Sequence, residues 1–254
     1  MFQIEDKLEK TAVVIAARSG SKGLSEKNIK PILGVPLLAW SIRYAQGVGL
    51  KPIVSTDSDK YASIARKYGG LTPFLRPESL ASDSTESAPV VLHAIDYFES
   101  ETGQKFEYVL LLEPTSPIRR FSLVRDALSM LRDGVESVVS VQKAGNAHPN
   151  FALKRNNQTG GSFSVLNGQP TLRRQLMDPV FYPDGSLYLS SIKTLREQRS
   201  FYHASTALLE VDSIEALDID DQQSFALVEF FMTQIIEQPD NPLFESFLWM
   251  KNDY

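Results

Sequence analysis

The stretch TAVVIAARSGSKGLSEKN, residues 11–28, decides the fold. Residues 11–17 are almost continuously apolar, as in a strand that is buried on both faces of a sheet. A polar loop with Gly20 and Gly23 follows, and Pro36 then precedes LLAWSIRYA, whose broad apolar face is typical of a helix. A buried strand followed by a polar loop and a helix is the repeating unit of an α/β fold.

The same alternation continues along the chain and predicts an α/β fold with a mostly parallel sheet flanked by helices. The further predicted strands span residues 52–55, 108–112, 137–141, 186–189 and 206–211. The further predicted helices span residues 60–68, 87–100, 122–132 and 222–236. Because the carboxyl ends of parallel strands lie along one edge of a sheet, the loops that begin at Arg18, Asp57 and Glu113 should meet in one cleft.

The segment from Gln142 to Pro183 interrupts this alternation with Asn, Gln, Gly, Pro and Arg. It is too long to be a simple connection inside a compact domain. We therefore interpret residues 1–254 as one domain, from which residues 142–183 form a lid, a dimerisation arm or a small subdomain.

The composition narrows the possible functions. The 254 residues include 26 Lys and Arg against 31 Asp and Glu, and the net charge of −5 argues against broad binding to nucleic acid or to an anionic membrane. The chain has no cysteine, which excludes disulfides and thiolate chemistry and favours the reducing cytoplasm. We expect a soluble protein, because no apolar run approaches the ~20 residues of a membrane helix.

The loop AARSGSKGLSEKN, residues 16–28, has the chemistry of a phosphate site. Its small residues let backbone N–H groups approach an anion, and Arg18, Lys22 and Lys27 supply positive charge. The loop contains neither a Walker A string nor G-x-G-x-x-G, so it belongs to neither of those nucleotide-binding classes. The alternative is a solvated basic loop, but its position after the first buried strand favours phosphate binding.

The segment ALDIDD, residues 216–221, is a candidate metal site. Alternate residues of an extended chain face the same way, so Asp218 and Asp220 can share a divalent cation such as Mg²⁺. The alternative is that Asp220 or Asp221 only caps the helix that begins near Gln222.

Two more segments could carry chemistry, and the second of them should lie at the edge of the cleft. In FLRPESLASDSTES, residues 74–87, the planar guanidinium of Arg76 suits a base edge or a ribose, although a surface salt bridge is the commoner role of an arginine. In YVLLLEPTSPIRR, residues 108–120, Glu113 ends a buried strand and two prolines stiffen the turn after it.

Seven blocks in this order resemble the acylneuraminate cytidylyltransferase family, the CMP-sialic acid synthetases of bacteria, over residues 12–236. The first block is the loop 16–28, and the others are STDSD (55–59), LRPESLASD (75–83), LLEPTSPIR (111–119), RRQL (173–176), PDGSLYL (183–189) and LDIDD (217–221). The resemblance implies a Rossmann-like nucleotidyltransferase fold with an inserted dimerisation arm, a homodimer, and Mg²⁺ or Mn²⁺ as cofactor. It also implies the transfer of CMP from CTP to a nine-carbon sugar acid, a nonulosonate, with release of pyrophosphate.

The resemblance also implies roles for single residues. Those assigned to the nucleotide are Arg18, Ser21, Lys22, Asn28, Arg76 and Asp83. Those assigned to the sugar are Lys27, Glu113, Asp184 and Arg174, the last possibly contacting the partner subunit's site. Catalysis is assigned to Arg18, Lys22, Lys27 and Asp220, and the metal to Asp218 and Asp220.

Two positions depart from the family pattern, because sialate-specific members have Gln where this chain has Glu113 and Asn where it has Asp184. A carboxylate only accepts hydrogen bonds, whereas an amide also donates. Either the sugar presents donors to these residues, or an arginine such as Arg119 or Arg173 pairs with Glu113. The alternatives for the function are an enzyme for another 2-keto-3-deoxy sugar acid and a catalytically silent homologue, and the retained Lys22 and aspartate pair argue against silence.

Overall fold

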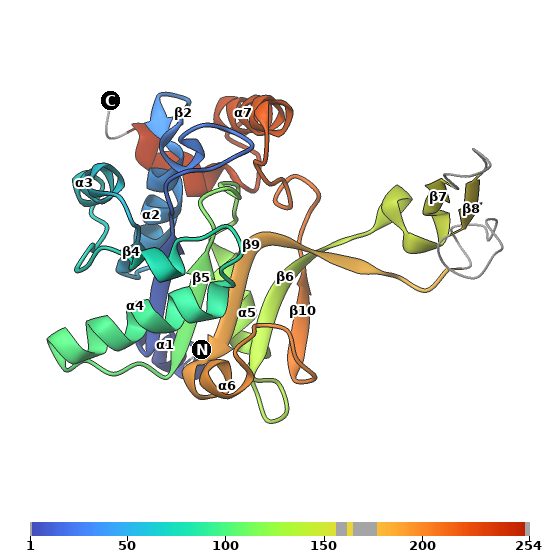
Figure 1. Cartoon of the computed structure of the whole chain (residues 1–254). Coiled ribbons are helices and arrows are strands. Elements are labelled where there is room, and N and C mark those ends of the chain that lie inside the picture. Colours follow the sequence, from blue (N-terminus) through green and yellow to red (C-terminus); the bar gives the residue numbers. More distant parts are fainter. Residues whose placement is uncertain (1, 156–161, 165–176, 252–254) are drawn as a thin grey trace.

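The computed structural model describes residues 2–155, 162–164 and 177–251, and a six-stranded sheet forms their centre (Figure 1). The order across this sheet is β10-β6-β9-β5-β1-β4. Its strands are β1 (Thr11–Ala16), β4 (Pro52–Ser55), β5 (Tyr108–Leu112), β6 (Ser137–Lys143), β9 (Phe181–Ser191) and β10 (Thr206–Glu210). β1 is parallel to both β4 and β5, whereas β9 is antiparallel to β5 and β6. The mostly parallel α/β sheet predicted from the sequence is confirmed.

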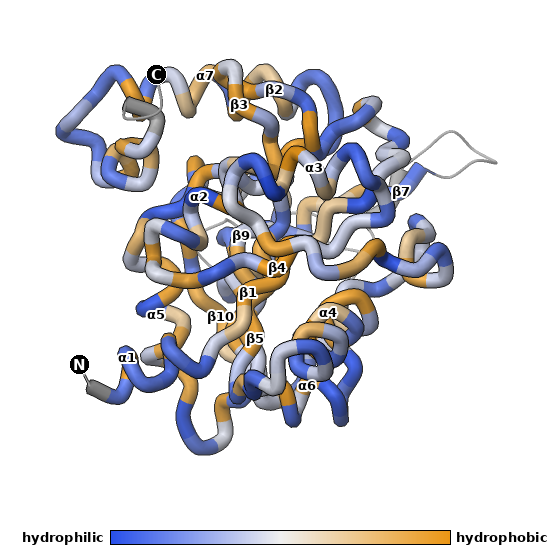
Figure 2. Tube along the Cα trace, turned by 90° about the vertical axis from the view of Figure 1, so that its left-hand side faces the viewer, coloured by the Kyte–Doolittle hydropathy of each residue, from blue (hydrophilic) through white to orange (hydrophobic). Residues whose placement is uncertain are grey.

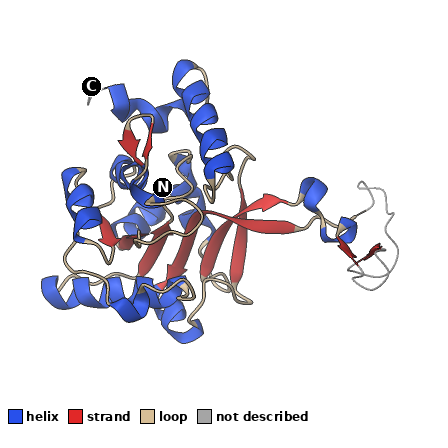
Figure 3. Ribbon diagram, turned by 45° about the horizontal axis from the view of Figure 1, so that its top comes forward, coloured by secondary structure: helices blue, strands red, loops and turns tan. Residues whose placement is uncertain are grey.

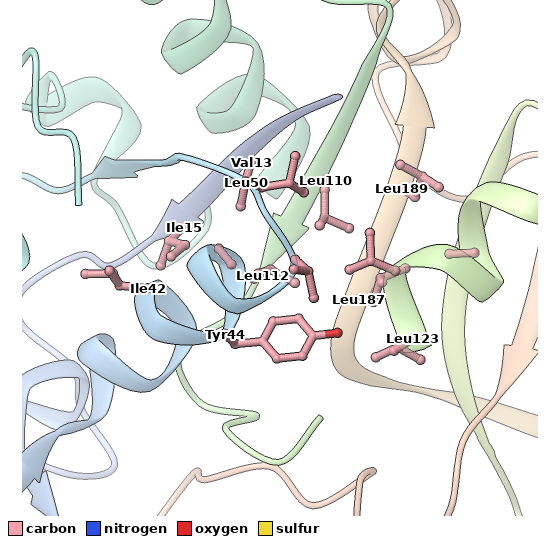
Figure 4. Close-up of a cluster of buried hydrophobic side chains, with 14 of the residues drawn as sticks. Val13, Ile15, Ile42, Tyr44, Leu50, Leu110, Leu112, Leu123, Leu187 and Leu189 are labelled. Atoms are coloured by element: carbon pink, nitrogen blue, oxygen red, sulfur yellow. The ribbon is translucent and has the colours of Figure 1, made fainter. Parts of the chain in front are cut away.

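Helices cover both faces of the sheet, which explains why β1 is apolar along its length. Val13 and Ile15 face the helices α1 (Phe2–Glu9), α2 (Leu37–Gly47) and α5 (Ser122–Met130). Ala12 and Val14 face the helices α4 (Ser87–Thr102) and α6 (Ile192–Gln198). Figure 4 shows the first of these two layers, and in Figure 2 the hydrophobic segments gather inside the molecule.

The remaining helices lie around these layers. α3 (Asp59–Lys67) contributes Ala65 to the first layer. α7 (Gln222–Glu237), the hairpin β2 (Pro31–Ile32) and β3 (Val35–Pro36), and the segment η6 (Phe244–Lys251) enclose a third cluster around Trp40 of α2. None of the helices in the described ranges has both the length and the apolar character that crossing a bilayer requires.

A narrow arm projects from the sheet, and β6 and β9 form its base (Figures 1 and 3). The pairing of β6 with β9 shifts register between Val139 and Val141 and then continues to Lys143 and Phe181. The outer part contains η3 (Gly145–Ala147), η4 (Pro149–Phe151) and the strand pair β7 (Leu153–Arg155) and β8 (Ser162–Ser164). The predicted limits at Gln142 and Pro183 are therefore wrong by one or two residues, because strand pairing continues past both. The RRQL block, with Arg173 and Arg174, lies outside the described residues.

Most of the other predicted elements agree with the structure within two residues at each end. The strand predicted over residues 186–189 is too short, because β9 begins at Phe181, where it continues to pair with β6. The helix predicted to end at Arg132 stops at Met130, because the chain then forms a bridge between Arg132 and Val135. The helices α1 and α6, the β2–β3 hairpin, the β7–β8 pair and the η6 segment were not predicted from the sequence.

Candidate active site

A pocket of about 490 Å³ lies at the carboxyl edge of the parallel strands. The loops after β1 and β5 contribute to it, as the parallel topology predicted, and the segments before α4 and before α7 contribute as well. The charged and polar side chains that line it are those of Arg18, Ser21, Lys22, Lys27, Asn28, Arg76, Asp83, Thr85, Ser87, Glu113, Thr115 and Asp220. We call it the nucleotide pocket, because all six residues that the resemblance assigns to the nucleotide line it.

The loop after β1 is fixed from both sides. Ser19 donates from its backbone nitrogen and from its hydroxyl to the two carboxylate oxygens of Asp57, at 2.7 and 2.8 Å. Burial opposes the ionisation of Asp57, but the two hydrogen bonds from Ser19 outweigh it and keep the pKa of Asp57 below its ordinary value. On the other side, Asn28 Nδ2 donates to the backbone oxygen of Arg18 at 3.0 Å. Asp57, which begins the loop after β4, thus anchors the loop after β1.

The same loop packs directly against the acidic segment before α7. Gly23 has no room for a side chain, because an added Cβ would stand 2.4 Å from the backbone oxygen of Asp220. Lys27 Nζ donates to the backbone oxygen of Ile219 at 2.6 Å and to Asp220 Oδ1 at 3.2 Å. The structure therefore brings together the basic loop and the acidic segment, which are almost two hundred residues apart.

Arg18 and Lys22, which the resemblance assigns to the nucleotide, share one counter-ion. Arg18 Nη2 lies 2.5 Å from Asp83 Oδ1, and Lys22 Nζ bonds the other oxygen of the same carboxylate. The hydrogen bond from Lys22, with the charge of Arg18, lowers the pKa of Asp83. Asp83 thus lies in the nucleotide pocket, as predicted for a nucleotide-binding residue, but here it neutralises the cations.

Arg76 forms part of the pocket wall. It is 6% exposed, and its Nε and Nη2 donate to the hydroxyl and the backbone oxygen of Ser55 at 3.0 and 2.5 Å. Burial lowers its pKa to about 10, so it remains positively charged at neutral pH. The alternative of a surface salt bridge is wrong for this arginine, because its partner is Ser55 at the end of β4.

Of the three aspartates in the acidic segment before α7, one caps the helix and two do not. Asp221 caps α7, and its Oδ1 accepts from the backbone nitrogens of Gln223 and Ser224 at 3.0 and 2.8 Å. Asp218 Oδ1 instead accepts from Ser116 Oγ at 2.9 Å, and Asp220 meets Lys27. Capping therefore explains Asp221 but leaves Asp218 and Asp220 available for other chemistry.

Asp218 and Asp220 fit a magnesium site that the substrate would complete. Among the described residues no group of three or more acidic, histidine or cysteine side chains is arranged to hold a metal ion. Mg²⁺, however, commonly takes only one or two carboxylates and completes its shell with water and substrate phosphates. Two carboxylates beside a pocket with phosphate-type cations match that donor set.

Glu113 lies between the nucleotide pocket and several buried charges. Burial, with the nearby charge of Asp218, raises the pKa of Glu113 to about 7, against the opposing charges of Arg119, Arg76 and Lys27. The predicted ion pair between Arg119 and the Glu113 carboxylate is not formed in the described structure. Arg119 is fully buried and donates to neutral oxygens, namely the backbone oxygens of Ser186 and Glu113 at 2.7 and 2.6 Å and Ser41 Oγ at 3.1 Å.

Asp184 is buried, with 4% of its surface exposed. Its Oδ1 accepts from Ser140 Oγ at 2.8 Å and from the backbone nitrogen of Ser186 at 2.7 Å. Its Oδ2 has no hydrogen-bond partner among the described residues. An unpaired buried carboxylate oxygen is costly, so this atom requires an explanation.

A second pocket, of about 470 Å³, lies beside the first, and Ser87 at the start of α4 lines both. Tyr188 and Tyr202 contribute aromatic walls to this pocket, and their rings pack edge to face with centroids 6.1 Å apart. The sequence analysis did not single out these tyrosines. The available signal was that Tyr188 follows Asp184 in the PDGSLYL block, at an alternate position of the same strand.

Comparison with known proteins identifies the family. A model of the cytidylyltransferase family matches residues 12–160, more than half of the chain. The chain belongs to the cytidylyltransferase family. A relative from Legionella pneumophila, CMP-N,N'-diacetyllegionaminic acid synthase, is 34% identical over 227 residues, which cover 86% of this chain and 94% of that protein.

Two other proteins are similar to this chain. N-acylneuraminate cytidylyltransferase of Escherichia coli is 31% identical over 86% of this chain, and the chain spans about half, 51%, of that longer protein. Among solved structures, CMP:2-keto-3-deoxy-manno-octonic acid synthetase in complex with CTP has a TM-score of 0.60 and 17% identity, covering 89% of this chain and 99% of that one. At that identity the likeness supports the fold, and it agrees with the predicted nucleotidyltransferase architecture.

Proposed function

We propose that this chain transfers CMP from CTP to the anomeric hydroxyl of a nonulosonate and releases pyrophosphate. The observation that carries the proposal is the nucleotide pocket itself, where Arg18 and Lys22 of the basic loop lie beside the Asp218 and Asp220 segment. Family membership and the relatives' activities support the same reaction.

In this reaction the anomeric hydroxyl attacks the α-phosphorus in line, and the protein's main tasks are positioning and the neutralisation of charge. Arg18 and Lys22 would neutralise the departing pyrophosphate, and phosphate oxygens would replace the Asp83 carboxylate between them. Asn28 and Arg76 would lie along the nucleoside, held in place by Arg18 and Ser55. Asp218 and Asp220 would hold Mg²⁺, which would supply Lewis-acid charge neutralisation when bound.

The proposed function is tested by pyrophosphate release. The protein is incubated with Mg²⁺, each of the four nucleoside triphosphates and a panel of nonulosonates and shorter 2-keto-3-deoxy sugar acids. Pyrophosphatase converts the product to phosphate, which is measured by malachite green. We expect release only with CTP and a nonulosonate. Release with a shorter sugar acid alone would assign a different acceptor, and no release with any pair would reject the proposal.

Lys22→Ala should lower kcat/KM for CTP by about 10- to 100-fold, because the change removes a charge-assisted contact of ~1.5–3 kcal/mol. The matched control is Lys51→Ala, since Lys51 is also exposed but lines a different pocket at the opposite edge of the sheet. Steady-state kinetics with varied CTP measures the effect. If the two variants have the same kcat/KM as the unmodified protein, the loop is only a solvated surface turn.

We also propose that the chain forms a homodimer through the arm. The arm projects from the domain, and its described outer part contributes few buried side chains (Figure 3). Multi-angle light scattering at micromolar concentration should return twice the 28.4 kDa of one chain. A mass of one chain under these conditions would contradict the dimer.

A further inference from the structure

The turn that follows β5 reaches from the nucleotide pocket into the interior of the protein. Ser116 donates from its backbone nitrogen to the backbone oxygen of Glu113 at 3.4 Å, which closes a β-turn. Pro114 holds the second position of this turn, where its fixed φ suits the backbone, and Pro117 follows the turn. Thr115 lines the nucleotide pocket, whereas Ser116 is fully buried. A rigid turn thus presents one residue to the ligand and its neighbour to the core.

The same turn holds the acidic segment before α7 in place. The backbone nitrogen of Ile219 donates to the backbone oxygen of Thr115 at 2.9 Å. Ser116 Oγ donates to Asp218 Oδ1, also at 2.9 Å. In the part of the chain that the structure describes, no other group donates a hydrogen bond to the Asp218 carboxylate. Ser116 therefore fixes one oxygen of Asp218 and leaves Oδ2 available to a ligand.

The hydroxyl of Ser116 has one proton and two acceptors within reach. Asp218 Oδ1 lies 2.9 Å from Oγ, and the backbone oxygen of Asp184 lies 3.3 Å from it. A carboxylate is a stronger acceptor than a carbonyl, and here it is also the nearer one. The proton therefore goes to Asp218, and the hydrogen bond is charge-assisted.

Gly185 leaves the space that this hydrogen bond needs. A Cβ at residue 185 would stand 2.8 Å from Ser116 Oγ and 3.6 Å from Asp218 Oδ1. The φ of Gly185, +85°, is also in the left-handed region, which glycine adopts without strain. The PDGSLYL block thus contributes its backbone, as well as its side chains, to the surroundings of Asp218.

We propose that Ser116 is a positioning residue that holds the Asp218 carboxylate in place for the divalent cation. This inference rests on the proposed function and names the residue that supports its metal site. Without the hydroxyl, the Asp218 side chain would have no donor to hold it, and binding the cation would require ordering it first. Groups that hydrogen-bond a metal-ligating carboxylate typically contribute about 10- to 100-fold to metal affinity or activity.

The test measures metal binding by the full chain. Mn²⁺ is titrated in the presence of CTP, without an acceptor sugar, and its binding is followed by water proton relaxation. Ser116→Ala should weaken the affinity for Mn²⁺ by about 10- to 100-fold. Ser116→Cys keeps a weak S–H donor and should weaken it less, by at least about threefold.

Turnover at varied Mg²⁺ gives a second readout. Ser116→Ala should need about 10- to 100-fold more Mg²⁺ for half-maximal pyrophosphate release. At saturating Mg²⁺ most of its turnover should return, because Asp218 and Asp220 are both still present. Asp218→Asn has lost a proposed ligand, so the same excess of Mg²⁺ should not restore its turnover.

Ser137→Ala is the matched control. Ser137 is also fully buried, and its hydroxyl donates to Ser190 Oγ at 2.7 Å. It lies at the start of β6, at the edge of the sheet opposite the nucleotide pocket, because β6 runs parallel to β5. Both alanine variants lose a buried hydroxyl and should be destabilised to a similar extent in urea. Only Ser116→Ala should change the affinity for Mn²⁺.

The outcomes separate the inference from the proposed function. Unchanged Mn²⁺ affinity in Ser116→Ala would overturn the inference, and so would an equal weakening in Ser137→Ala. If Ser116→Ala does not fold, Ser116→Cys decides in the same way. If no sugar supports pyrophosphate release, the proposed function fails, while Mn²⁺ binding with CTP still tests the role of Ser116.

Discussion

Asp218→Asn should leave less than a tenth of the Mg²⁺-dependent turnover, and Asp220→Asn should do the same. Each change removes one negative charge from the segment that fits the metal, and a tenfold loss corresponds to only about 1.4 kcal/mol of barrier. The fold should survive, because the amide oxygen introduced by Asp218→Asn could still accept the hydrogen bond from Ser116. In addition, Asp221, not these two residues, caps α7.

The measurement needs a readout of metal binding beside the turnover. Mn²⁺ binding in the presence of CTP, followed by water proton relaxation, should weaken in both variants in step with the loss of activity. Glu210→Gln provides the control, since Glu210 is an exposed carboxylate at the end of β10. Retention of more than a tenth of the turnover, or unchanged Mn²⁺ binding, would refute the assignment of the two aspartates.

Glu113→Gln should raise the free energy of unfolding by about 3 kcal/mol at pH 8 and by almost nothing at pH 4. Burial raises the pKa of Glu113 from 4.5 to about 7 in the folded protein. Between these values the folded state keeps a proton that the unfolded state has lost, so the stability of the unmodified protein falls as the pH rises from 4.5 to 7. Glutamine does not titrate, and the variant is free of this loss.

Urea unfolding at the two pH values measures this difference. Glu101→Gln, at an exposed position near the end of α4, serves as the control and should change the free energy of unfolding equally little at both pH values. A Glu113→Gln effect of the same size at pH 4 and pH 8 would show that Glu113 titrates normally in the folded protein. A carboxylate that destabilises the fold at neutral pH is expected at a functional position, because activity and stability compete there.

Local patterns were enough to predict the centre of the fold. The strand β1 is apolar at every position from Ala12 to Ile15, and both faces of the sheet are covered in the structure. The parallel topology predicted that the basic loop after β1 lies at the carboxyl edge of the sheet, whereas only the family resemblance placed the LDIDD segment at the same site. The hydrogen bonds of Lys27 to Ile219 and Asp220 join the two segments.

Interactions between distant side chains could not be predicted in this way. The sequence places Arg119 six residues after Glu113, which suggested an ion pair, but the tertiary structure directs its guanidinium to carbonyl and hydroxyl oxygens. The direction of β9 was equally hidden, because an apolar strand has the same composition whether it runs parallel or antiparallel. Asp83 as counter-ion of Arg18 and Lys22 depends on a loop more than sixty residues away.

The bulge between β6 and β9 lies at the base of the arm and includes Asp184. Between the pairs Val139 with Tyr188 and Val141 with Pro183, β6 contributes only Ser140, whereas β9 contributes residues 184–187. The hydroxyl of Ser140 donates to Asp184 Oδ1 and accepts from the backbone nitrogen of Leu187, each at 2.8 Å. One side chain therefore bonds both ends of the bulged segment 184–187. The two strands that carry the arm are therefore joined through this buried carboxylate, so the arm and Asp184, which the resemblance assigns to the sugar, depend on the same strand pair.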